Sequence, residues 1–352
     1  MLTHILIALF AVFVLLALAG VVYQALGAAR DARELPPPGE MVDVGGRRLH
    51  LHAMGQGSPT VVLEAGVAAS SLSWSGIQPE VARFARVLSY DRAGLGWSEP
   101  SPQPVSARQK VEELRTLLDR AAIGGPYLLV GHSFGGLLAQ MYATLHPGEV
   151  AGLVLLDALH AREWLHPTPE QRRMIRGSVF FSRVGAVLAS VGFVRFCLSR
   201  FTAGSTGMPR AVLSWFGRGA TAVVSRLVGE IQKLPTAVWP MVRAHWCLPK
   251  CYWAMAQHLA ALPRCCAEAA AAAPLPDIPL IVVSAGDATP ARMTEQQALV
   301  RSSTQACHLI ATASGHWVQL DQPELVVHAI HELVELWRKK DSSSQLQSGE
   351  GV

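Results

Sequence analysis

Charged residues are scarce in this sequence: Asp, Glu, Lys and Arg make up 16% of the 352 residues, against about 25% in typical soluble domains. The formal excess of positive charge is only +4 and is scattered along the chain, so no nucleic-acid partner is indicated. Half of the residues are hydrophobic, which excludes a wholly disordered chain because apolar burial can offset the entropy lost on ordering. A long coiled coil is also excluded, since 30 Gly and 22 Pro are spread along the sequence.

Lys and Arg are absent from the first 29 positions, and no charged residue occurs from Ile5 to Leu26. This run reaches the roughly 20 apolar residues that a membrane-crossing helix needs. There are two alternatives: a signal peptide cleaved at Ala17–Ala19, and a helix buried in the protein. Signal peptides usually carry basic residues before an apolar region of about 7–15 residues, and this sequence does not fit that pattern. We therefore predict one N-terminal membrane anchor over residues 1–29, with the lipid bilayer as its partner and the side of the membrane left open.

Cysteine occurs at only six positions, five of them between residues 197 and 266. Cys247 and Cys251, with His245 and His258 nearby, are residue types that bind zinc, but no second ligand pair has the spacing of a zinc finger. We therefore expect no metal and no cofactor, and either free thiols or disulfides at the cysteines.

Short apolar runs alternate with segments of helical periodicity through much of the chain, after a proline-rich linker over residues 30–40. The expected strands are Met41–Val44 and Arg48–Ala53, which form a hairpin, and Thr60–Glu64, Val87–Tyr90, Tyr127–Val130, Leu153–Leu156, Leu280–Val283 and His308–Ala311. The expected helices are Ala107–Ala121, Leu137–Leu145 and Leu325–Trp337. Such alternation predicts a mostly parallel sheet with helices on both faces.

The alternation stops between residues 160 and 274, where helix-like stretches rich in Trp, Ala and Arg follow one another. We interpret this segment as an all-helical cap inserted between two parts of an α/β core, residues 41–159 and 275–340. The cap is expected over the carboxyl edge of the sheet, where open α/β sheets bind their ligands. The Ser- and Gln-rich tail, residues 341–352, is expected to be disordered.

The segment Gly131–Gly135 matches the pattern G-x-S-x-G. It follows the expected strand Tyr127–Val130 and precedes an expected helix, which is the context of a nucleophile elbow, a strained turn that exposes a serine. The helix N-terminus favours negative charge near Ser133. A serine that only caps the helix is the alternative. His132 is expected to point away from Ser133, because neighbouring side chains on a sharp turn diverge.

Four stretches, in this order, resemble the α/β-hydrolase superfamily: Leu63–Gly66, Tyr90–Ser98, Gly131–Gly136 and Ser314–His316. The resemblance runs from about Met41 to Arg338, apart from the cap. It implies an eight-stranded, mostly parallel sheet with helices on both faces, a helical cap after the sixth strand, and a serine–histidine–acid triad that works through an acyl-enzyme.

Within this resemblance Ser133 is the nucleophile, and His316 is the base because it lies between the last expected strand and the last expected helix. The acid stays open between two aspartates. Asp287 follows the seventh strand, the commoner place in the family, and Asp157 ends the sixth strand, the place that some relatives use. Either one preserves the order of serine, acid and histidine along the chain.

The oxyanion of an acyl transfer needs two backbone N–H donors, and those of Phe134 and Val67 are the candidates. Glu64 is interpreted as a structural carboxylate, and Asp91 and Arg92 as an ion pair that pins a loop. Five tryptophans either line an acyl pocket or pack in the core: Trp74, Trp97, Trp239, Trp246 and Trp253.

These features predict a serine hydrolase of the carboxylesterase or lipase type that cleaves a small, hydrophobic ester. Hydrolysis of C–C or amide bonds and perhydrolysis use the same triad and are alternatives. A non-catalytic α/β-hydrolase scaffold that binds a ligand or a partner is another. Serine at position 133 disfavours epoxide hydrolase and haloalkane dehalogenase activity, since a resemblance to either of these enzymes would require aspartate at the nucleophile position.

Overall fold

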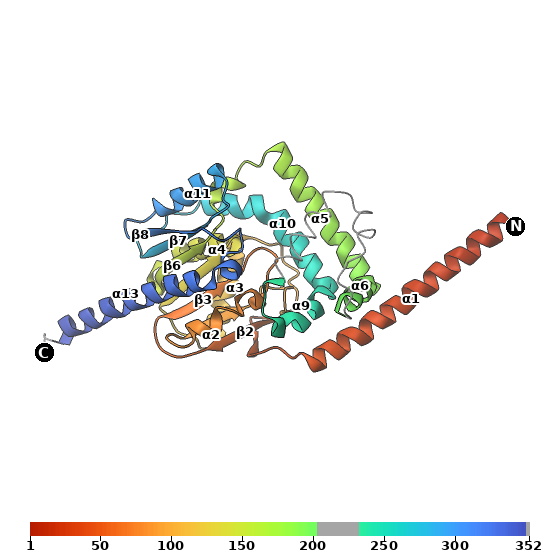
Figure 1. Ribbon diagram of the computed structural model, residues 1–352, viewed down its shortest axis with the longest axis horizontal. Helices are drawn as coiled ribbons and strands as arrows, with labels where there is room; N and C mark the ends of the chain where they lie inside the picture. The colour runs from red at the N-terminus through yellow and green to blue at the C-terminus, as the bar shows by residue number, and fades with distance from the viewer. Residues whose placement is uncertain (203–231, 350–352) are drawn as a thin grey trace.

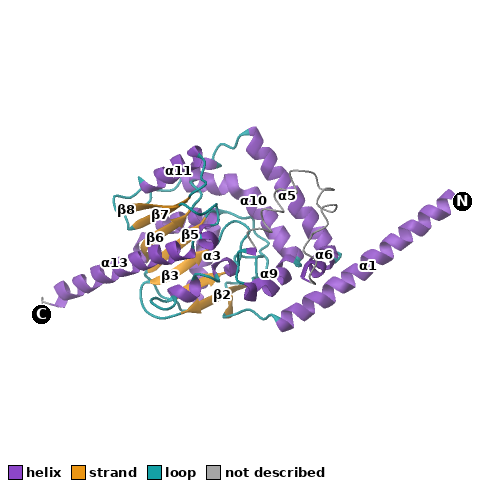
Figure 2. Cartoon of the chain, viewed as in Figure 1, coloured by secondary structure: helices purple, strands orange, loops and turns teal. Residues whose placement is uncertain are grey.

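A computed structural model of the chain describes residues 1–202 and 232–349 (Figure 1). Within these residues one sheet lies between two layers of helices, further helices form a cap beside the sheet, and a long N-terminal helix extends away from the body (Figure 2).

The strands of the described residues form one eight-stranded sheet in the order β1-β2-β4-β3-β5-β6-β7-β8. The strands are β1 (Glu40–Asp43), β2 (Arg48–Met54), β3 (Thr60–Glu64), β4 (Val87–Tyr90), β5 (Tyr127–His132), β6 (Val150–Leu156), β7 (Leu280–Ala285) and β8 (Ala306–Ala311). β2 pairs antiparallel with β1 and β4, and all other pairs are parallel. The expected mostly parallel sheet is confirmed, and β3 and β4 have the predicted bounds.

Helices cover both faces of the sheet. One face carries α3 (Ala107–Arg120), α4 (Phe134–Leu145) and α11 (Pro290–Val300), and the other carries α2 (Gln78–Val81), α12 (Val318–Asp321) and α13 (Pro323–Gly349). The alternation of side chains along a strand divides the core: Leu129 of β5 packs on the α3–α4 side, whereas Leu128 and Val130 pack on the α13 side. Short 3₁₀ turns lie at Ser71–Trp74, Pro147–Glu149, Ala161–Glu163 and Thr236–Val238.

Between β6 and β7 the described secondary structure is helical, with loops and turns joining the helices. Its helices are α5 (Pro169–Ser190), α6 (Phe193–Thr202), α9 (Trp239–Trp246) and α10 (Pro249–Ala270), and residues 203–231 of the predicted cap lie outside the described residues. α10 packs along α5 and also reaches α3 and α4 of the core, so it joins the cap to the sheet.

The N-terminal helix α1 (Leu2–Glu34) is the one described helix long and apolar enough to cross a membrane. It continues past residue 29, where the predicted anchor ends, and takes up the first part of the predicted linker. Its end is set by Leu35 and Pro36, since the residue before a proline is disfavoured in the helical conformation.

The C-terminal helix α13 also extends beyond its predicted end. It runs to Gly349, so residues 341–349, which we expected to be disordered, continue the helix. The reason lies in the sequence itself: after Pro323 no Pro or Gly interrupts the helix before Gly349.

Candidate active site

Ser133 stands on a strained turn between β5 and α4. Its backbone has φ 54° and ψ −119°, a conformation that L-residues rarely adopt. The flanking glycines make the turn possible: a Cβ at Gly131 would lie 2.6 Å from the carbonyl oxygen of Gly135, and a Cβ at Gly135 would lie 2.3 Å from that of Glu64. Local sterics therefore require the glycine–x–serine–x–glycine spacing.

A chain of hydrogen bonds joins Ser133 to an aspartate through His316. The Nε2 atom of His316 lies 3.0 Å from Ser133 Oγ, and its Nδ1 atom lies 2.5 Å from Asp157 Oδ2. The loop that carries His316 is held by Asp321, whose carboxylate accepts hydrogen bonds from Gly315 N (3.0 Å) and Ser314 Oγ (3.2 Å). The three side chains come from the ends of β5, β6 and β8, so they meet at the carboxyl edge of the sheet.

The structure brings Asp157, and not Asp287, to His316. Asp157 follows β6 and also accepts a hydrogen bond from Arg292 Nε at 3.1 Å. Asp287 is exposed in the loop after β7, and no hydrogen bond between its carboxylate and His316 occurs among the residues that the structure describes. Burial alone would raise the pKa of Asp157, but the hydrogen bond with His316 and the charge of Arg292 outweigh it and lower the pKa, so the carboxylate stays ionised at pH 7.

His132 does not point away from the site as we expected. Its ring centroid lies 4.8 Å from that of His316 and 5.1 Å from that of Trp317. His132 Nε2 lies 2.8 Å from the carbonyl oxygen of His316, and because a carbonyl only accepts, Nε2 carries the hydrogen. Burial lowers the pKa of His132 to about 3, so this ring is neutral at pH 7 and braces the backbone at His316 without adding charge.

The two expected oxyanion donors lie next to Ser133. Phe134 follows it in the chain, and Val67 follows Gly66, where an added Cβ would lie 3.7 Å from Ser133 Cβ. Within the described part of the chain, no hydrogen bond uses the backbone N–H of Phe134 or Val67. Both donors are therefore available to a ligand.

Arg92 holds the loop that carries Val67. The side chain of Arg92 is buried. Its guanidinium donates a hydrogen bond to the carbonyl oxygen of Ala65 at 2.6 Å and another to that of Gly66. Glu64 pairs with the same guanidinium, as expected of a structural carboxylate. Because the C=O and N–H of one peptide bond point in opposite directions, the hold on the Gly66 carbonyl also fixes the direction of the Val67 N–H.

The expected ion pair between Asp91 and Arg92 is wrong. Asp91 instead accepts hydrogen bonds from the backbone N–H groups of Ser71 (2.7 Å) and Trp97 (3.0 Å), and its carboxylate lies 2.9 Å from His50 Nδ1. Adjacent residues in extended backbone project to opposite sides, so one carboxylate and one guanidinium support different loops.

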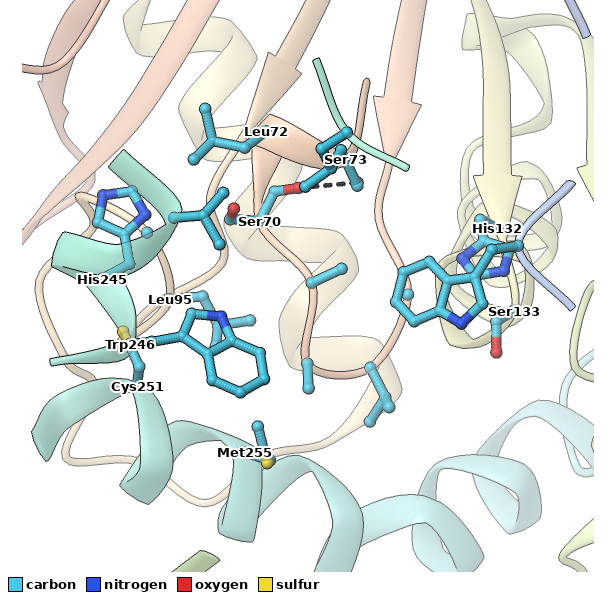
Figure 3. A pocket seen from close by; sticks show the side chains of 18 of the residues that line it. Ser70, Leu72, Ser73, Leu95, His132, Ser133, His245, Trp246, Cys251 and Met255 are labelled. Atoms are coloured by element: carbon cyan, nitrogen blue, oxygen red, sulfur yellow. Dashed lines mark hydrogen bonds between the residues drawn. The ribbon is translucent and has the colours of Figure 1, made fainter. Parts of the chain in front are cut away.

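A pocket opens beside Ser133 and His132 and extends beneath the cap, where Trp246, Cys251 and Met255 line its opposite wall (Figure 3). Its volume is about 180 Å³. The remaining described lining residues are Gly66, Val67, Ala68, Ala69, Ser70, Leu72, Ser73, Leu95, Gly96, Leu234, Val242, His245, Tyr252, His316, Trp317 and Leu320. None of these described residues is Lys, Arg, Asp or Glu, so the pocket suits an uncharged, largely apolar ligand.

The tryptophans divide between pocket and packing. Of the five named from the sequence, Trp246 lines the pocket, Trp74 is fully buried in the core, and Trp97 packs against His245 with ring centroids 4.3 Å apart. Trp239 and Trp253 are 38% and 46% exposed. All six cysteines are free thiols, so the alternative of disulfides is wrong for this structure.

Sequence reasoning missed Trp317 and Arg292 at the site and gave Arg92 the wrong partner. Trp317 could have been noticed, since it follows His316 directly. Arg292 and the true partners of Arg92 had no local signal, because Asp157 lies 135 residues from Arg292 and Gly66 lies 26 residues from Arg92 in the chain.

Part of the chain matches a described protein family. The model of a family described as the alpha/beta hydrolase fold matches residues 59–193, a range that contains Ser133 and Asp157 but ends before His316. An uncharacterized protein of Bacillus subtilis, YqjL, is 37% identical over 106 residues, which are 30% of this chain and 42% of that protein.

A relative of named activity is the 2-hydroxy-6-oxo-2,4-heptadienoate hydrolase of Pseudomonas putida, 34% identical over 125 residues, or 34% of this chain and 45% of that protein. The chain thus spans less than half the length of these two curated relatives. Among solved structures, a thermophilic esterase from Thermogutta terrifontis superposes with a TM-score of 0.58 over 84% of this chain and 97% of the esterase. At 20% identity this likeness shows the fold alone.

Proposed function

We propose that the chain, whose residues 59–193 match the family described as the alpha/beta hydrolase fold, is a serine hydrolase that cleaves an uncharged, hydrophobic ester through an acyl-enzyme. The observation that carries the proposal is the hydrogen-bonded chain from Ser133 through His316 to Asp157. A serine hydroxyl is a weak nucleophile until a base within hydrogen-bonding reach accepts its proton, and the 3.0 Å contact with His316 provides that base.

In the proposed reaction Ser133 Oγ attacks the ester carbonyl while His316 Nε2 takes its proton. His316 then returns the proton to the leaving alkoxide, the C–O bond breaks, and the acyl group stays on Ser133. A water molecule, activated by the same imidazole, releases the acid and restores the enzyme. Asp157 keeps the hydrogen of His316 on Nδ1 and stabilises the imidazolium that forms, a role that its lowered pKa supports because the carboxylate must be ionised.

The developing oxyanion is assigned to the backbone N–H groups of Phe134 and Val67. Both lie at the nucleophile and neither is used within the described residues, so they are aimed before substrate arrives. Removing one such donor in an acyl-transfer enzyme costs about 10²–10³ in kcat. The hold of Arg92 on the Val67 loop is therefore part of the proposed catalytic framework.

The substrate class rests on the lining of the pocket. A volume of about 180 Å³ exceeds the roughly 150 Å³ of an apolar cavity that admits benzene, so a short acyl chain or an aromatic ring fits beside Ser133. The described lining contains no cation to pair with a carboxylate, which favours a neutral ester over an anionic one.

We also propose that α1 is retained as a membrane anchor. Its best 18-residue window has a mean hydropathy of 3.2, and none of that window is buried against the protein. An exposed apolar surface of this length is costly in water and stable in a bilayer.

A second reaction, hydrolysis of a C–C bond, is favoured by one observation: the similarity to the 2-hydroxy-6-oxo-2,4-heptadienoate hydrolase. The dienoate substrate of that enzyme carries a carboxylate, and the described lining of the pocket has no Lys or Arg to pair with it, which disfavours C–C hydrolysis. The two candidates differ in what they turn over, so the dienoate and a neutral ester should be assayed on the same preparation.

A series of p-nitrophenyl esters with acyl chains of increasing length tests the proposal. We expect a burst of p-nitrophenol equal to the enzyme concentration, turnover that rises and then falls as the chain outgrows the pocket, and no burst from Ser133→Ala. The variant Ser70→Ala, which changes another serine of the pocket, should keep the burst. Turnover of the dienoate without turnover of any ester would replace ester hydrolysis by the C–C reaction, and an intact burst from Ser133→Ala would refute the mechanism.

A further inference from the structure

The second half of α1 packs against the cap, whereas the side chains of its first half are exposed apart from Ala17. The contact begins at Gly20, where a Cβ would lie 2.1 Å from the carbonyl oxygen of Val191 in the turn between α5 and α6. It continues at Gly27, where a Cβ would lie 2.6 Å from the side chain of Arg195. Glycines seven residues apart lie on the same side of a helix two turns on, so they let the cap approach the axis of α1 closely.

A buried polar cluster locks this contact. Gln24 is 6% exposed; its Nε2 donates to the carbonyl oxygen of Cys247 at 2.7 Å, and its Oε1 accepts from Arg195 Nε at 2.9 Å. Arg195 also pairs with Asp31 at 2.7 Å, with both side chains largely buried. A buried, hydrogen-bonded pair keeps a defined geometry because breaking it would leave a charge without a partner. The direction of α1 therefore fixes the orientation of the cap.

The free part of α1 has the length of one bilayer crossing. Every side chain from Leu2 to Ala19 is exposed except the half-buried Ala17. At 1.5 Å per residue this stretch is about 27 Å long, close to the roughly 30 Å of the hydrocarbon layer. If α1 spans the membrane, the hydrocarbon layer thus ends near Gly20, at the level where the cap first touches the helix.

At this level the cap presents α5 to the membrane surface. α5 contacts α1 and runs across its direction rather than along it (Figure 1), so it lies along the surface of a bilayer that α1 crosses. The exposed side chains of α5 are mostly of two kinds. Arginines are Arg172, Arg173, Arg176 and Arg183, and large apolar side chains are Met174, Phe180, Phe181 and Val187, of which Phe180 is 61% exposed.

We propose that α5 is an interfacial helix that binds the surface of a bilayer containing anionic lipids, beside the α1 span. Phenylalanine side chains that are costly in water enter the boundary between headgroups and acyl chains, and the arginines pair with lipid phosphates. One acidic residue, Glu170, lies in the first turn of α5, so the exposed charge is strongly positive and complements an anionic leaflet. The proposal rests on the membrane anchoring proposed above and is independent of the ester chemistry.

The test uses the full-length chain in liposomes of phosphatidylcholine with and without phosphatidylglycerol. The exposed Cys307 is replaced in a Cys307→Ser background, and Phe180→Cys is labelled with an environment-sensitive fluorophore. Glu332→Cys on α13, which is exposed on the opposite layer of the core, is the matched control. We expect lipid-borne nitroxide to quench the label at 180 and aqueous iodide to quench it several-fold less than the label at 332. Protection of the label at position 180 from iodide should increase with the fraction of phosphatidylglycerol. It should decrease in the triple variant Arg172→Gln/Arg173→Gln/Arg176→Gln.

The outcomes separate the two proposals. A protein that stays in the membrane after an alkaline wash, but whose label at 180 is as accessible to iodide as the label at 332, would overturn the interfacial helix and leave the anchor intact. A protein that is washed off would overturn both. Labelling of Ser133 by an active-site probe does not depend on either result and reports on the hydrolase chemistry alone.

Discussion

The variant Asp157→Asn changes one atom at the end of the hydrogen-bonded chain that runs from Ser133 through His316. It tests whether Asp157 or Asp287 is the acid of the triad. The amide of asparagine can place an N–H toward His316 Nδ1, 2.5 Å from the replaced oxygen, which drives the ring hydrogen to Nε2. That nitrogen then cannot take the proton of Ser133. The corresponding change in a serine protease lowers kcat by about 10⁴, or about 5.5 kcal/mol of transition-state stabilisation, and we expect a loss of this order. Asp157 is not among the pocket-lining residues, so KM for a short ester should change little.

The control is Asp287→Asn, which removes the same charge from an exposed loop and should keep kcat within about twofold of the unmodified enzyme. Both variants are assayed by hydrolysis of a soluble p-nitrophenyl ester, and thermal unfolding checks that the fold is retained, because Asp157 also pairs with Arg292. A large loss in Asp287→Asn with near-normal turnover in Asp157→Asn would refute the assignment of the acid.

Three further changes test the framework of the site. Gly131→Ala places a methyl group 2.6 Å from the backbone of α4 and should lower kcat for ester hydrolysis about a hundredfold. Gly124→Ala is the control: a Cβ there has no atom within 4 Å, so kcat should not change. Arg92→Lys keeps the charge but loses the fork that holds the Gly66 carbonyl, so kcat should fall about tenfold or more at unchanged KM, and an unchanged kcat would exclude this positioning role. The pKa of His132 is about 3 in the folded protein, below the ordinary value of 6.5 for histidine. Between these two values the unfolded chain binds one proton more than the folded protein, so the stability of the fold falls as the pH is lowered. Thermal unfolding should therefore show a smaller loss from pH 7 to pH 5 in His132→Gln than in the unmodified chain, and an equal loss would contradict the buried neutral ring.

The nucleophile elbow could be predicted from the sequence because its causes are local. Gly131 and Gly135 flank Ser133 within one turn, and each glycine is required by backbone that lies immediately next to it in space. The strands β3 and β4 were predicted with correct bounds for a similar reason, since each is a short apolar run closed by turn residues.

The identity of the acid could not be predicted, because both aspartates follow a strand that ends at the same edge of the sheet. Which of them reaches His316 depends on how the loops after β6, β7 and β8 are placed relative to one another. Asp157 has φ 35°, a backbone conformation that non-glycine residues rarely adopt and that no local sequence pattern predicts. The partners of Arg92 were missed for the same reason: the position beside Asp91 suggested a pair within the loop, whereas Arg92 binds the Glu64 carboxylate at the end of β3 and the carbonyl groups of Ala65 and Gly66 in the loop after it.

The most direct test of the central claim is covalent labelling of the full-length chain with a fluorophosphonate probe, followed by mass spectrometry of the modified peptide. A serine activated by an adjacent imidazole attacks phosphorus and becomes phosphonylated, whereas an ordinary serine does not. We expect one modified residue, Ser133, with labelling abolished in Ser133→Ala and retained in Ser70→Ala. Absence of labelling in the folded, unmodified protein, or a modified serine other than Ser133, would contradict it.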